Sequence, residues 1–293
     1  DVLYDVLRKQ EWYREYLKAE GADSVPFIGR FNGAAPRVVA ADITNTLGID
    51  REFRQTCLTW EDFLTKFVRK AEGARVLVLR SSFVGSNTRR SLDVDEFRGF
   101  AISDTLAPLV FINSRDAKAA QIFTLAHELA HLWIGASGIS NPDYTERSGH
   151  QWHTTDRHCD NIAAEVLVPA ADFTSAWGDS KSLDANVGDL ARRYKVSAFV
   201  VLRRAYNLNK IQADVYRTKY QELLSESIKA RQGTGTFYPT FLARNSTTFA
   251  TTLMIAAAEG RVSQKEASLL LNVRLATLPS VEKHVLASGL ANA

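Results

Sequence analysis

The spacing of apolar and polar residues predicts a chain that is helical over most of its length. Apolar positions three and four residues apart are typical of helices with one buried face. Before residue 170 this spacing predicts helices over residues 1–20, 36–47, 59–73, 117–134 and 156–168. Thr59 and Thr155 are the expected N-caps of the third and fifth helices, and Gly135 is expected to end the fourth. Two further helices are expected over residues 190–197 and 199–208, and the pattern is helical again over residues 237–293.

Three short segments have the composition of strands instead. They are rich in β-branched and aromatic residues and bounded by Gly, Pro, Asn or Asp, and they cover residues 75–80, 97–102 and 109–112. A small sheet therefore precedes the helix over residues 117–134, which predicts an α+β fold. Residues 136–155 are expected to form a loop, and residues 169–182 a linker.

Breaks in the pattern divide the chain into three predicted regions. Residues 1–175 are expected to form a core with N-terminal helices, residues 176–232 a helix-turn-helix-like subdomain, and residues 233–293 a C-terminal helical accessory domain. The last break is marked by Gly233 and Gly235.

Composition narrows the class of protein. With 293 residues, 45% of them hydrophobic and 24% charged, the chain has the size and composition of a soluble enzyme. Its net charge is +3 with acids and bases interleaved, so binding of DNA is possible but not demanded. Cys57 and Cys159 lie far apart without metal-finger spacing, which favours the reducing cytoplasm. The longest apolar run, residues 253–258, is far shorter than the ~20 residues of a membrane span, so no membrane contact is expected.

The segment His127-Glu128-Leu129-Ala130-His131 carries the strongest chemical signal. Residues four apart lie on one face of a helix, so His127 and His131 can bind one zinc ion. Glu128 then lies beside the metal, where a carboxylate can act as a general base toward water. The apolar residues between the histidines agree with a helix buried against a sheet.

A catalytic zinc ion needs a third protein ligand, which must come from elsewhere in the chain. The candidates downstream are His150, His153, Asp156, His158, Asp160 and Glu165. Asp156 and Asp160 share one helical face, whereas Glu165 points to nearly the opposite side. We expect Asp156 to bind zinc and Asp160 to accept a hydrogen bond from a ligand histidine, with Glu165 as the alternative ligand. His153 could stabilise an oxyanion, or it could simply be solvated like most loop histidines.

Two segments resemble the ImmA/IrrE family of bacterial and phage zinc peptidases. They are Phe123–Trp133, around the histidines, and Asp156–Pro169, which contains Cys159, Asp160 and Ala-Ala-Glu-Val-Leu-Val-Pro. The strands with Arg98–Asp104 and Val110–Asn113 are also similar, so the resemblance covers roughly residues 70–175. It implies a zincin-like peptidase core and a third ligand at Asp156, where Glu is the commoner family residue.

The resemblance also implies a substrate. Family members cleave a helix-turn-helix transcriptional repressor and thereby release stress, mobile-element or defence genes. Many carry a repressor-like helix-turn-helix upstream, and a chain that begins with Asp1 instead of Met is expected to have been processed or trimmed.

The basic residues between positions 190 and 204 allow two interpretations. They could contact DNA phosphates, or they could be surface charges of a helical subdomain packed beside the peptidase. These residues are Arg192, Arg193, Lys195, Arg203 and Arg204.

Three functional hypotheses follow from the sequence: a zinc endopeptidase, a DNA-binding regulator with a non-cleaving sensor core, and a zinc hydrolase of another kind. The intact Glu128 favours the peptidase, because a non-cleaving descendant has no chemical need for a base beside both histidines.

Overall fold

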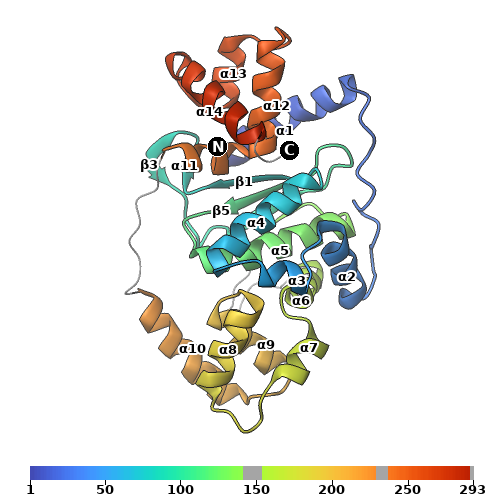
Figure 1. Ribbon diagram of the computed structural model, residues 1–293, viewed down its shortest axis with the longest axis vertical. Helices are drawn as coiled ribbons and strands as arrows, with labels where there is room; N and C mark the ends of the chain where they lie inside the picture. Colours follow the sequence, from blue (N-terminus) through green and yellow to red (C-terminus); the bar gives the residue numbers. More distant parts are fainter. Residues whose placement is uncertain (141–153, 229–236, 291–293) are drawn as a thin grey trace.

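The computed structural model describes residues 1–140, 154–228 and 237–290 and shows an α+β fold. A small sheet lies between two layers of helices, and a further group of helices extends from one end of the molecule (Figure 1). His150, His153, Gly233 and Gly235 lie outside the described residues. The three-part division of the chain remains a prediction.

The main sheet has four strands in the order β1-β5-β4-β6. Their bounds are β1 Leu77–Ser81, β4 Gly99–Ile102, β5 Leu109–Asn113 and β6 Gly138–Ser140. β1 and β5 are parallel, with Leu77 opposite Leu109, whereas β4 runs antiparallel to both β5 and β6. A separate antiparallel hairpin consists of β2 Phe83–Val84 and β3 Asn87–Ser91. The three predicted strands are confirmed, with ends shifted by one or two residues.

One face of the sheet packs against a layer of helices, most of which the amphipathic pattern predicted. Val78, Val110 and Ile112 point from β1 and β5 into this core. The helices on this side are α2 Pro36–Leu47, α3 Arg51–Gln55, α4 Trp60–Gly73, α5 Lys118–Ile134 and α6 Thr154–Leu167. The predicted cap at Thr59 is present, because its side chain accepts a hydrogen bond from the Asp62 amide.

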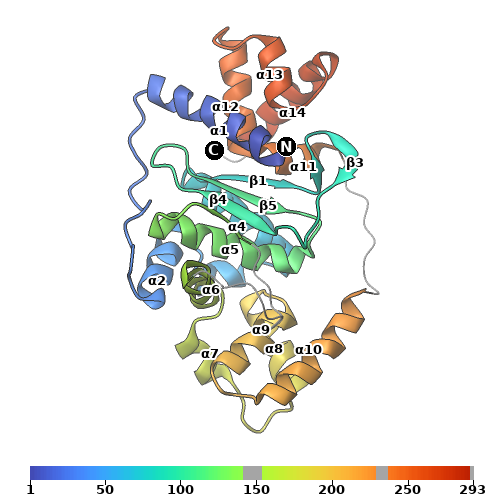
Figure 2. The same ribbon diagram turned by 180° about the vertical axis from the view of Figure 1, so that it is seen from behind.

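The opposite face joins the first and last parts of the chain in one core. Leu79, Phe100 and Phe111 alternate with the residues of the first face and point toward α1 and the C-terminal helices. These elements are α1 Val2–Ala19, α11 Phe237–Asn245, α12 Thr247–Ala258, α13 Gln264–Leu270, the short 3₁₀ helix η1 Leu275–Thr277 and α14 Leu278–Leu290. Figure 2 shows α1 lying across the sheet beside α12 and α14.

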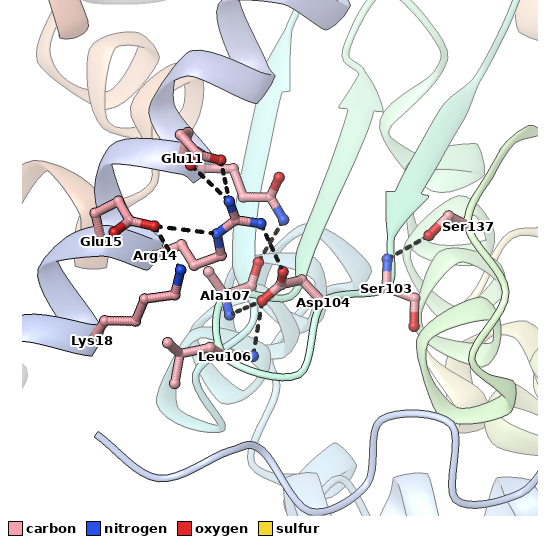
Figure 3. Close-up of polar contacts among 10 residues, drawn as sticks. Glu11, Arg14, Glu15, Lys18, Ser103, Asp104, Leu106, Ala107 and Ser137 are labelled. Atoms are coloured by element: carbon pink, nitrogen blue, oxygen red, sulfur yellow. Dashed lines mark hydrogen bonds and ion pairs between the residues drawn. The ribbon is translucent and has the colours of Figure 1, made fainter. Parts of the chain in front are cut away.

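Polar contacts fasten α1 to the turn between β4 and β5. Arg14 of α1 lies 3.5 Å from a carboxylate oxygen of Asp104, and Gln10 donates a hydrogen bond to the Ala107 carbonyl. Asp104 also accepts hydrogen bonds from the Leu106 and Ala107 amides (Figure 3). The turn is therefore held by the same carboxylate that pairs with α1.

Four helices form the end of the molecule farthest from the C-terminal helices (Figures 1 and 2). They are α7 Ala170–Ala176, α8 Leu183–Tyr194, α9 Ala198–Asn207 and α10 Ala213–Ile228. The expected pair of helices about a short turn is present as α8 and α9, although α8 begins at Leu183, seven residues before its predicted start. Within the described ranges, no helix is both long and apolar enough to cross a lipid bilayer.

Several local predictions were wrong. Thr155 is not an N-cap, because α6 already begins at Thr154. The expected linker over residues 169–182 contains α7, whose first amide group at Ala170 donates to the Glu165 carboxylate. Part of the expected loop over residues 136–155 pairs with β4 as strand β6, because β4 offers a free edge there. Helices α3 and α10 and the β2–β3 hairpin were not predicted.

Candidate metal centre

The two motif histidines lie on α5, a helix with almost no exposed surface. His127 and Glu128 have no exposed surface, and His131 retains 2%. The helix ends as predicted at Gly135, which adopts a left-handed conformation with φ of 76°. A Cβ atom at this position would also lie 2.8 Å from the Gly29 Cα, so glycine is needed for packing as well as for the turn.

Helix α6 packs against α5 and brings its carboxylates to the histidines. A carboxylate oxygen of Asp156 lies 3.4 Å from the His131 Nε2, and the two Nε2 atoms of His127 and His131 are 3.1 Å apart. One ligand atom from each of these residues lies within 4.8 Å of the others. The predicted metal ligands therefore meet at one point, although they come from segments more than twenty positions apart.

This set of donor atoms fits a zinc ion in spacing and chemistry. Ligand atoms about 2 Å from a tetrahedral zinc ion lie roughly 3.3 Å from one another. The distances of 3.1 and 3.4 Å among His127, His131 and Asp156 match this spacing. Two imidazoles and one carboxylate leave a fourth position open, which is the arrangement of catalytic zinc sites.

Asp160 orients one of the histidines. Its carboxylate lies 2.8 Å from the His127 Nδ1, which leaves the Nε2 of the same ring directed at the cluster. Burial opposes a charge on His127, but this hydrogen bond and the nearby Glu128 carboxylate outweigh burial and raise its pKa. For His131 burial dominates and lowers the pKa, which favours the neutral form that binds metals.

Glu128 is enclosed between α5 and the sheet. A Cβ atom at Gly99 of β4 would lie 2.9 Å from the Glu128 Oε1 and 2.7 Å from the Thr124 Cγ2. Gly99 therefore allows the strand to approach the helix that carries the candidate base. This role of Gly99 was not predicted, although a glycine inside a strand is a signal of close backbone approach.

Two buried arginines hold the far end of α6. Arg54 of α3 donates hydrogen bonds of 2.6 and 3.0 Å to the carbonyls of Val166 and Leu167, and one of 3.1 Å to the carbonyl of Tyr194. Arg204 of α9 donates to the Val168 carbonyl and pairs with Glu165. Both arginines are at least 90% buried.

This arginine clamp, Arg54 with Arg204, satisfies the carbonyl groups that a helix leaves without intrahelical partners. It also sets the direction of α6, and thereby the position of Asp156 and Asp160 at the other end of the helix. Neither role was predicted, because nothing in the local pattern distinguishes these arginines from surface ones.

Among the described residues, the candidates Glu165 and His158 do not join the cluster. Glu165 is directed at Arg204 and the start of α7, as the helical face argument requires. His158 lies on α6 but is not part of the His127–His131–Asp156 group. Burial raises the pKa of the Cys159 thiol, which stays neutral beside the acidic residues.

Most of the basic residues of α8 and α9 have partners within the protein. Arg192 pairs with Asp189, Arg193 with Asp172, and the buried Arg204 with Glu165. Lys195 donates a hydrogen bond to the Leu58 carbonyl, which lies between α3 and α4. Arg203 lies over the rings of Tyr206 and Tyr216. These contacts favour a packed helical subdomain over a surface that reads DNA.

Comparison with protein families agrees with this site. Residues 71–206 match the peptidase M78 model, described as the IrrE N-terminal-like domain. This segment belongs to the ImmA/IrrE family. The ImmA/IrrE segment includes the whole main sheet, α5 and α6, and it continues beyond residue 175 through α8 and most of α9. No curated protein and no solved structure matches the chain. The family is one of metallopeptidases, and the His-His-Asp cluster lies within the matched segment.

Proposed function

We propose that the chain is a zinc-dependent endopeptidase with a zincin-like core. In this proposal His127, His131 and Asp156 hold the zinc ion, and Glu128 is the general base. The observation that carries the proposal is the meeting of these three ligand atoms within 4.8 Å, with the fully buried Glu128 next to His127 in the sequence of α5. Membership of the ImmA/IrrE family supports the peptidase activity independently of this geometry.

Each residue then has a separate task. A zinc ion supplies Lewis acidity, which acidifies water and polarises the peptide carbonyl. Glu128 accepts the proton of the attacking water and returns it to the leaving amine, because a peptide nitrogen is a poor leaving group unless it is protonated. Asp160 keeps the Nε2 of His127 directed at the ligand cluster through the 2.8 Å contact with Nδ1. Burial of Glu128 excludes bulk water, which strengthens the electrostatic interactions around it.

The proposed substrate is a protein, a helix-turn-helix transcriptional repressor of the kind that this family cleaves. The regulatory setting would be stress response, mobile elements or defence. This part of the proposal rests on the family resemblance. The partners of Arg192, Arg193 and Arg204 within the chain support a protein substrate over direct binding of DNA by α8 and α9.

The experiment is a comparison of wild type with Glu128→Gln. Metal content is measured by mass spectrometry, and cleavage is followed on the repressor encoded beside the gene, in the presence of the inducing effector. Wild type should carry about one zinc equivalent per chain. Glu128→Gln should keep the zinc and lose cleavage by at least ~100-fold, the usual scale for a general base. Glu259→Gln, an exposed glutamate among the C-terminal helices, is the matched control and should cleave like wild type.

The outcomes separate the hypotheses. Cleavage that persists in Glu128→Gln refutes the assigned mechanism. Protein prepared without chelator that never carries metal refutes the zinc site. Zinc-loaded wild type that binds operator DNA but cleaves no repressor favours the alternative, a DNA-binding regulator with a non-cleaving core.

A further inference from the structure

A small pocket lined by residues of α1, β1, β2, β5 and α11 lies on the face of the sheet opposite the metal centre. Figure 2 shows α1 and α11 on this side of the sheet. Two basic side chains line it, Lys9 from α1 and Arg244 from α11, and we call it the Lys9–Arg244 pocket. Its walls also include Asp5, Ser81 and Phe83. The pocket admits roughly one water-sized particle.

Lys9 is buried but has only part of its bonding capacity satisfied. The side chain is 1% exposed, and its ammonium group donates one hydrogen bond of 2.8 Å, to Asp5. An ammonium group has three donors. The Asp5 carboxylate also accepts hydrogen bonds from Arg8 and Asn272, so it is shared among three donors.

Arg244, the second basic residue of the pocket, is buried with fewer polar contacts than Lys9 has. It is 9% exposed, and its guanidinium donates no hydrogen bond to any residue that the structure describes. Its Nε lies fully inside without a partner, and its contact with Phe83 is an aromatic one, 5.6 Å from the ring centre. Burial lowers the pKa of both Lys9 and Arg244, which reflects two positive charges held away from water.

Buried charges in proteins are normally paired, and an unpaired one calls for a counter-ion or a bound water. Asp5 is one carboxylate among the charges of Lys9, Arg8 and Arg244, so positive charge remains in excess. We propose that the Lys9–Arg244 pocket binds a small monatomic anion of the halide class, held between the two basic side chains. The small space favours a monatomic anion over a large organic one such as gluconate. The anion would join α1 to α11 and thereby fasten both to the sheet.

The test compares sodium chloride with sodium gluconate at equal ionic strength, using the full chain after dialysis free of halide. Chloride tenfold above its Kd should raise the Tm of wild type by roughly 2–5 °C relative to gluconate. Salts also act on proteins non-specifically. The specific effect is therefore the difference between wild type and Arg244→Gln, with Arg274→Gln, an exposed arginine near α13, as the matched control.

We expect Arg244→Gln and Lys9→Met to lose the response to chloride and Arg274→Gln to keep it. A second measurement uses bromide as the probe: its anomalous scattering in crystals should place one ion between Lys9 and Arg244. If Arg244→Gln does not fold, the bromide position in wild type decides. Bromide bound elsewhere or nowhere, or equal chloride responses in all foldable variants, overturns the proposal and leaves a water molecule in the pocket.

Discussion

Gly99 offers the sharpest test of how the sheet positions the candidate base. A methyl group at this position would lie 2.7 Å from the Thr124 Cγ2, 2.9 Å from the Glu128 Oε1 and 2.9 Å from the Phe111 carbonyl oxygen. Carbon atoms do not approach other atoms this closely without a shift of the structure. The Phe111 carbonyl belongs to the paired strand β5, so the displacement is expected to fall on the Thr124 and Glu128 side chains.

Overpacking of this kind costs about 1–3 kcal/mol of folding free energy. We therefore expect Gly99→Ala to lower the free energy of unfolding by this amount. Displacement of a catalytic group by ~1 Å can reduce the rate by ~100-fold. If the proposed function holds, kcat/KM should fall by a factor between ~10 and ~100, while the zinc content stays near that of wild type, because the methyl group contacts none of the three ligands.

Denaturant titration measures the stability, and repressor cleavage measures the activity. The matched control is Gly73→Ala at the end of α4, where a Cβ atom would meet nothing within 4 Å. That variant should be neutral or more stable by up to ~1 kcal/mol, because alanine favours helices over glycine. If Gly99→Ala matches wild type in both stability and cleavage, the close approach of β4 to Glu128 is not as described.

Three further predictions concern α6 and the C-terminal helices. Asp156→Ala should abolish zinc retention, whereas Glu165→Ala, which removes the partner of Arg204, should weaken folding and keep the zinc. Mass spectrometry measures the metal content of both variants, and the opposite result would transfer the ligand role to Glu165. Arg54→Met should lower the free energy of unfolding by roughly 3 kcal/mol or more and weaken zinc affinity, because three carbonyls lose their donor; unchanged denaturation and zinc titrations would contradict the clamp. Burial raises the pKa of Glu72, against its hydrogen bonds from Ser246 and Thr247, from 4.5 to about 7. The protonated Glu72 therefore contributes fully to the free energy of unfolding below pH ~4.5, and this contribution, on the order of 3 kcal/mol, is lost as the pH rises through ~7. Glu72→Gln should remove this pH dependence of the free energy of unfolding, which denaturation curves measured between these pH values would show.

Local chemistry in the sequence was sufficient for most of the helices and for the three residues of the His-His-Asp cluster. Thr59 caps α4 and Gly135 ends α5 because capping depends on the residue itself and its nearest neighbours. The spacing of His127 and His131 placed both on one face of a helix, and the same geometry separated Asp156 from Glu165. The structure brings Asp156 to the histidines and directs Glu165 elsewhere, as that spacing requires.

Tertiary structure alone decided which distant segments meet. The contact of Gly99 with Glu128, the position of Arg54 at the end of α6, and the shared core of α1 with α11–α14 depend on long-range packing. Short elements such as α3 and α7 also escaped prediction, because a helix of five to seven residues has little intrinsic stability and forms where its neighbours satisfy its ends. The unpaired charge of Arg244 is the extreme case. Its sequence neighbours predict an ordinary helical arginine, and only the fold buries it without a hydrogen-bond acceptor among the residues that the structure describes.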